Sequence, residues 1–103
     1  MEKKEFVRSD KTKGYEYKLE DGDEVTAKRQ KVGTRENLIV KDGQAVIIEN
    51  HFLEVEYNGE LITIKITQGQ KKILDKTEDL TDKTIIAKSY ENDFGTFVGV
   101  RVK

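Results

Sequence analysis

Residues 51–66 contain the feature that most restricts how this chain can fold, a β-hairpin centred on an Asn-Gly dipeptide. Segments of alternating apolar and polar residues flank Asn58 and Gly59, and Asn-Gly is the pair most typical of a two-residue type I′ turn. A turn of two residues sets Val55 opposite Ile62. One face of the hairpin then carries the apolar side chains of Leu53, Val55, Ile62 and Ile64. Because turn and alternation agree, the sequence predicts a β protein built around this hairpin.

The N-terminal third of the chain predicts a tail followed by a further hairpin. Residues 1–13 alternate in charge without a hydrophobic period, which predicts a flexible N-terminal tail. Residues 14–103 predict a single β-rich domain. Within that domain, residues 14–32 predict an N-terminal hairpin that turns near Gly22.

The remainder of the chain predicts one short helix within a run of strands. Thr67 and Gln70 have the spacing of a helix capping box, which predicts a helix near 68–76. Residues 44–103 therefore predict the order strand, strand, strand, helix, strand, strand, with strands at 45–48, 51–57, 60–66, 84–90 and 96–102. This is the order of the oligonucleotide/oligosaccharide-binding (OB) barrel. The predicted fold is mainly β: a small OB-like barrel, or a sandwich, of antiparallel strands with one short helix.

Composition narrows the class of protein further. A chain of 103 residues has the size of one domain that can build its own core. It contains no cysteine, which excludes disulfides and Cys-ligated zinc. No stretch reaches the roughly 20 apolar residues of a membrane helix, and the N-terminal residues lack the apolar run of a signal peptide. We expect a small soluble cytoplasmic protein without a membrane partner, and the net charge of −1 argues against a general polyanion binder.

The last predicted hairpin, over 84–102, carries the clearest candidate for a binding surface. A four-residue loop over 91–94 sets Tyr90 opposite Gly95, and one face of the hairpin then joins the core through Ile85, Val98 and Val100. The other face and the loop hold Lys88, Tyr90, Phe94, Phe97 and Arg101. Aromatic rings stack on bases and cations contact phosphates, so this face is typical of a platform for single-stranded nucleic acid. Packing of the same face against the helix or the N-terminal strands is the alternative.

A basic segment at 28–35 is the second candidate. It holds four cations around Gly33, those of Lys28, Arg29, Lys31 and Arg35. Such a segment can follow a phosphate backbone. The alternative is a solvated edge hairpin whose lysines prevent association between sheet edges, and the carboxylates at 20–24 offset the positive charge.

No pattern in the chain is typical of an active site. His51 is the only histidine, and no local motif supplies it with a nucleophile and an orienting partner. The acidic residues at 20–24 and 75–82 lack the spacing of a calcium-binding loop and are typical of charged turns. We therefore expect a non-enzymatic protein with no catalytic residues, no metal site and no cofactor.

These observations lead to two expectations for function. The first is a non-enzymatic nucleic-acid-binding module for single-stranded DNA or RNA, which uses the aromatic and basic face of the last hairpin. The second is a protein-interaction or inhibitor module that uses the same patch or an exposed strand edge. The two differ in salt response, because phosphate binding releases counterions and weakens steeply as salt rises.

Overall fold

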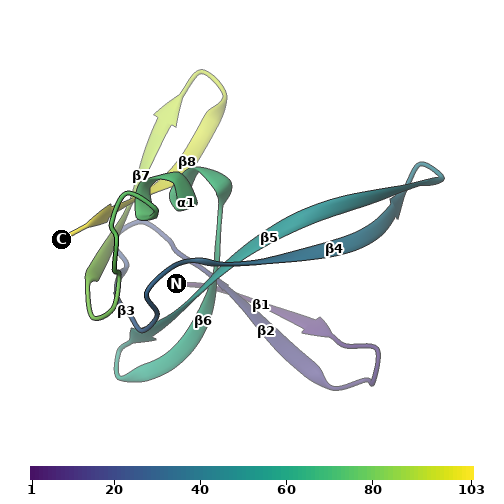
Figure 1. The fold of residues 1–103 in the computed structure, drawn as a ribbon, viewed down its shortest axis with the longest axis horizontal. Coiled ribbons are helices and arrows are strands. Elements are labelled where there is room, and N and C mark those ends of the chain that lie inside the picture. Colours follow the sequence, from purple (N-terminus) through teal and green to yellow (C-terminus); the bar gives the residue numbers. More distant parts are fainter.

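The computed structural model describes residues 1–103 and shows a mainly β protein with one short helix, as the sequence predicts. The elements are β1 (Glu2–Val7), β2 (Lys13–Lys18), β3 (Glu24–Ala27), β4 (Gly33–Lys41), β5 (Gln44–Tyr57), β6 (Glu60–Ile66), α1 (Gln68–Leu74), β7 (Thr84–Asn92) and β8 (Gly95–Val102). The strands form one sheet in the order β1-β2-β6-β5-β3-β7-β8, and β4 pairs with β5 outside this path. The sheet is open and curls into a half-barrel (Figure 1), consistent with the predicted small OB-like barrel.

The β5–β6 hairpin lies at the centre of the sheet in the predicted register. Asn58 and Gly59 have φ values of 50° and 81°, as a type I′ turn requires, and Val55 pairs with Ile62. The core contains five of the predicted residues, Leu53, Val55, Ile62, Ile64 and Ile85. Val98 and Val100 pack against this core but are only partly buried, because β8 is the last strand of the sheet and has no strand on its outer side.

Strand β5 is longer than the sequence predicts. It runs for 14 residues where we expected two strands, at 45–48 and 51–57. No glycine or proline interrupts it, and β4 pairs with its first part while β6 pairs with its second. Only two strands therefore precede the helix within residues 44–103, and the half-barrel is completed by β2, which pairs in parallel with β6, and by β3, which lies between β5 and β7.

The predicted hairpin over 14–32 is not present, because β2 and β3 do not pair with each other. β2 pairs with β1 and β6, and β3 pairs with β5 and β7. The chain between them crosses to β7, where the Gly22 N–H donates to the Ala87 carbonyl and the Ala87 N–H donates to the Asp23 carbonyl, at 2.9 and 2.8 Å. Long-range pairing therefore overrides the local turn signal.

Residues 1–13, expected to be a flexible tail, instead contain β1, which pairs antiparallel with β2 from Glu2–Lys18 to Val7–Lys13. Every residue of β1 is exposed. At β1, neither face of the β1–β2 hairpin packs on the core. The sequence of this strand is therefore charged and shows no alternation of apolar and polar residues. The strand was therefore not recognisable from its hydrophobic pattern.

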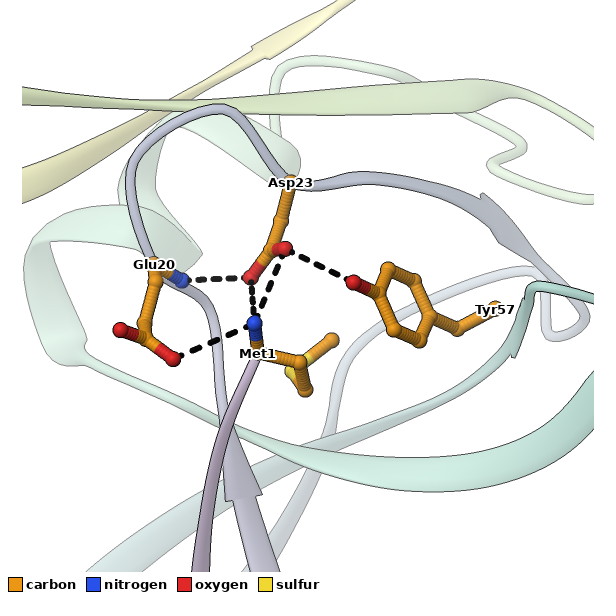
Figure 2. A network of polar contacts seen from close by, with 4 residues as sticks. All are labelled: Met1, Glu20, Asp23 and Tyr57. Carbon is orange, nitrogen blue, oxygen red and sulfur yellow. Dashed lines mark hydrogen bonds and ion pairs between the residues drawn. The ribbon is translucent and has the colours of Figure 1, made fainter.

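A polar network holds the beginning of β1 against the half-barrel (Figure 2). The Met1 ammonium lies 3.0 and 2.9 Å from the two carboxylate oxygens of Asp23 and 3.2 Å from Glu20 Oε1. Asp23 also accepts hydrogen bonds from the Tyr57 hydroxyl at 3.1 Å and the Glu20 N–H at 2.7 Å. The side chains of Met1 and Asp23 are only 5% and 8% exposed, so this carboxylate is buried with its partners in place.

The helix begins at the predicted capping box. Thr67 Oγ1 accepts a hydrogen bond from the Gln70 N–H at 3.1 Å, and Gln70 Oε1 accepts one from the Thr67 N–H at 3.0 Å. The Gln70 amide nitrogen also donates to the Val98 carbonyl at 2.9 Å. This contact ties α1 to the outer edge of β8. With seven residues, α1 is too short to span a membrane.

Candidate nucleic-acid interface

The β7–β8 hairpin turns over two residues, not the four that we expected. Asn92 pairs with Gly95, and Tyr90 therefore pairs with Phe97. The tighter turn forms because Asn92 Oδ1 accepts a hydrogen bond from the Phe94 N–H at 2.8 Å, while Gly95 adopts a φ of 129°. The register is shifted by two residues from the expected one. Since strand side chains alternate with a period of two, the shift leaves the predicted face intact.

Tyr90 and Phe97 form a stacked pair on this face. Their ring centroids are 5.8 Å apart and their planes differ by 30°. Gly99 lies beneath the tyrosine, since a Cβ at that position would be 3.2 Å from a Tyr90 ring carbon. Tyr90 and Phe97 are 52% and 41% exposed, so neither the helix nor the N-terminal strands bury them. Ring packing thus fixes the orientation of a flat aromatic surface that solvent can still reach.

A groove of about 1030 Å³ runs beside the aromatic pair. It lies where the half-barrel remains open, between β8 on one side and the ends of β2 and β6 on the other. The rings of Tyr90 and Phe97 line one wall, Gly69 and Ile73 of α1 contribute a second, and Lys18 and Lys65 reach it from across the opening. The groove is thus partly apolar, and Lys18, Lys65 and the acidic Glu2 are its charged lining residues.

Three cations around this surface form no ion pair. Lys88 and Arg101 share the face of the aromatic pair, because they lie opposite Gly99 and Ile86 in the register. Both are exposed, and neither they nor Lys18 has a carboxylate within ion-pair distance. Lys65, in contrast, contacts Glu16 at 3.4 Å. Phe94 is 90% exposed at the tip of the hairpin, beyond the groove.

The basic segment does not join this surface. Lys28 lies 3.0 Å from Asp82 and 3.6 Å from Glu56, and the hydrogen bond to Asp82 raises the pKa of the Lys28 ammonium above its ordinary value. Arg29 pairs with Glu54 at 3.4 Å.

The other two cations of the segment are also separated from the groove. Lys31 lines a small cavity of about 310 Å³ beside Asp75, and Arg35 lies on β4 opposite Asn50. None of the segment's four cations lines the groove. The four cations of the basic segment therefore lie apart from the aromatic pair and the groove.

His51 lies in an environment typical of a residue with a structural role. It is 7% exposed, and its Nδ1 lies 2.8 Å from the Thr34 hydroxyl oxygen, a contact that joins β5 to the beginning of β4. No group of three or more His, Cys, Asp or Glu side chains in the structure is close enough together to hold a metal ion.

The groove includes residues that were not predicted from the sequence, notably Lys18, Gly69 and Ile73. Their position depends on the parallel pairing of β2 with β6 and on the contact of α1 with β8. Neither contact leaves a local signal in the sequence.

Comparison with known proteins finds no family model, no curated protein and no solved structure that matches this chain.

Proposed function

We propose that this protein is a non-enzymatic module that binds single-stranded nucleic acid across the outward face of β7–β8. The observation that carries the proposal is the stacked pair of Tyr90 and Phe97, about half exposed and bordered by cations without carboxylate partners. Stacking on an aromatic ring contributes about 1–3 kcal/mol per base and tolerates any base, because every base has a π-face.

The groove suits a strand whose bases are unstacked. A base on the Tyr90–Phe97 pair leaves its backbone close to Lys88 and Arg101, and the absent side chain of Gly99 allows close approach. Lys18 on the opposite wall can contact the next phosphate. Bases inside a duplex cannot reach such rings, so the preferred ligand is a single strand. With a net charge of −1, binding depends on these few cations and is sensitive to salt.

Replacing Phe97 with alanine should weaken the binding of a fluorescently labelled single-stranded oligonucleotide about 5- to 150-fold, the equivalent of one lost stacking contact. Fluorescence anisotropy at low salt measures the dissociation constant. Tyr15→Ala is the matched control, because Tyr15 is 47% exposed on β2 and does not line the groove. Both variants should still unfold in one cooperative transition, since neither residue belongs to the core. The proposal fails if the wild-type protein does not bind the oligonucleotide, or if the two variants lose equal affinity.

Replacing Arg101 with alanine should reduce the steepness of the salt dependence. The slope of log K against log salt should fall by about one unit, since one phosphate contact is lost. The matched control is Arg29→Ala, which removes a cation that already pairs with Glu54 and should leave the slope unchanged. An unaltered slope in Arg101→Ala would place the phosphate contacts elsewhere.

A further inference from the structure

The β4–β5 hairpin projects from the half-barrel as an isolated ribbon, the arm, comprising residues 33–50 (Figure 1). Every residue from Gly33 to Glu49 is exposed. Strand β6 pairs with β5 only as far as the His51–Ile66 pair, and β3 pairs with it only near Val55. Both long edges of the arm are therefore without a neighbouring strand.

Both faces of the arm are apolar in the two strand segments that precede and follow its polar tip. Because side chains alternate along a strand, one face carries Ile39, Val46 and Ile48, and the other carries Leu38, Val40, Ala45 and Ile47. Leu38, Val40 and Ile47 are 71%, 76% and 64% exposed, and none of the seven belongs to the core. An isolated two-stranded ribbon is at best marginally stable in water, so this composition indicates that another surface covers the arm.

The edges of the sheet differ in how they are protected against association. The outer edge of β1 carries Glu2, Lys3, Lys4 and Glu5, and the outer edge of β8 accepts a hydrogen bond from Gln70 at the Val98 carbonyl. Strand β4 has charged residues at both ends of its outer edge. The free edge of β5, in contrast, has no charged residue from Gln44 to Ile48. Charged side chains are the usual protection of an exposed edge, and this run of five residues lacks them.

We propose that the free edge of β5 pairs with the same edge of a second copy of this chain, antiparallel and about a two-fold axis at Ile47. The axis sets Val46 opposite Ile48 of the second copy and Ala45 opposite its Glu49. The free edge spans residues 44–50 and ends where β6 begins to pair at His51. Ile47 is its midpoint, so the two free edges match over their whole length. The product is a continuous four-stranded sheet, β4-β5-β5-β4.

The distribution of charged residues favours this edge over the other edge of the arm. Pairing about Ile47 places no two like charges opposite each other. Self-pairing of β4 about its midpoint, Asn37, would set the charged Arg35 and Glu36 opposite the apolar Ile39 and Leu38. Symmetric dimers are the commonest assemblies of soluble proteins.

Other occupants fit the arm less well. It carries two cations against three carboxylates, which disfavours nucleic acid. Its tip is the polar run Lys41-Asp42-Gly43-Gln44, and unpaired strand edges are unfavourable in a membrane interior.

Light scattering after size-exclusion chromatography, and sedimentation equilibrium, should show the wild-type protein as a dimer that dissociates on dilution. A45E brings a new carboxylate opposite Glu49 of the second copy, whereas A45K brings an ammonium there. The dimer of A45E should therefore dissociate at a concentration about tenfold or more above that of A45K, because the contact occurs twice across the axis. Circular dichroism and the unfolding midpoint should confirm that both variants fold, since Ala45 lies outside the core.

The double variant A45E/E49K should restore the dimer, because each new carboxylate then faces a new ammonium across the axis. A wild-type protein that remains monomeric at every concentration overturns the proposal. Equal association of A45E and A45K overturns it as well, since only the stated register distinguishes the two charges. Oligonucleotide binding by β7–β8 is measured separately and does not depend on this result.

Discussion

Replacing Ile64 with alanine should lower the free energy of unfolding by about 2–5 kcal/mol, which combines lost burial with the cavity that remains. Ile64 is fully buried. It lies on β6 between Leu53 of β5 and Tyr17 of β2, at the point where the only parallel pairing of the sheet joins the N-terminal strands to the central hairpin. Urea denaturation, followed by circular dichroism, measures the change. A domain of this size has a total stability of about 5–15 kcal/mol, so the loss is a large part of it.

The control for this variant is Thr63→Ala, one residue earlier on the same strand. Thr63 is exposed on the opposite face, and its replacement should change the free energy of unfolding by no more than about 1 kcal/mol. Equal unfolding midpoints for the two variants would contradict the assignment of the two faces of β6.

Replacing Asp23 with asparagine should lower the free energy of unfolding by about 1–3 kcal/mol near neutral pH, because the charged partner of a buried network is lost. The Met1 ammonium would keep only Glu20, which is 55% exposed, as an ion-pair partner. The Tyr57 hydroxyl would face an amide in place of a carboxylate. Asp93→Asn is the matched control, since Asp93 is exposed in the β7–β8 turn, and its replacement should leave stability nearly unchanged.

The effect of Asp23→Asn should depend on pH at both ends of the range. Burial alone raises the pKa of the Asp23 carboxyl, but the hydrogen bonds from the Glu20 N–H, the Met1 ammonium and the Tyr57 hydroxyl outweigh burial and hold this pKa below its ordinary value of 3.8. Its contribution to stability is thus present above pH 3.8 and is lost as the pH falls through the lower pKa of the folded state.

The Met1 ammonium behaves in the opposite sense. The hydrogen bond to Asp23 raises the pKa of this group above its ordinary value of 8.0, and its effect exceeds the opposite effect of partial burial. Its contribution is present below pH 8.0 and is lost as the pH rises through the higher pKa of the folded state. Unfolding curves at several pH values should show the difference between wild type and Asp23→Asn at its largest between these limits. A difference that stays constant from acid to alkaline pH would contradict the network.

Local chemistry in the sequence determined the elements whose hydrogen bonds close within a few residues. Asn58-Gly59 supplies the positive φ values of its turn, and Thr67 with Gln70 satisfies the first N–H groups of α1. The alternation in β7 and β8 identified the face of Tyr90 and Phe97 even though the turn was predicted two residues too long, because a shift of two residues keeps each side chain on its face.

Tertiary structure alone decided the features that depend on partners far away in the chain. Strand β1 has no apolar pattern and exists because β2 pairs with it. Lys28 and Arg29 belong to a basic segment of the sequence, and only the fold brings Asp82 and Glu54 beside them. The groove exists because the sheet curls without closing, which leaves β8 facing β2 across α1. Such contacts join segments tens of residues apart, and the side chains that make them follow no local period from which they could be predicted.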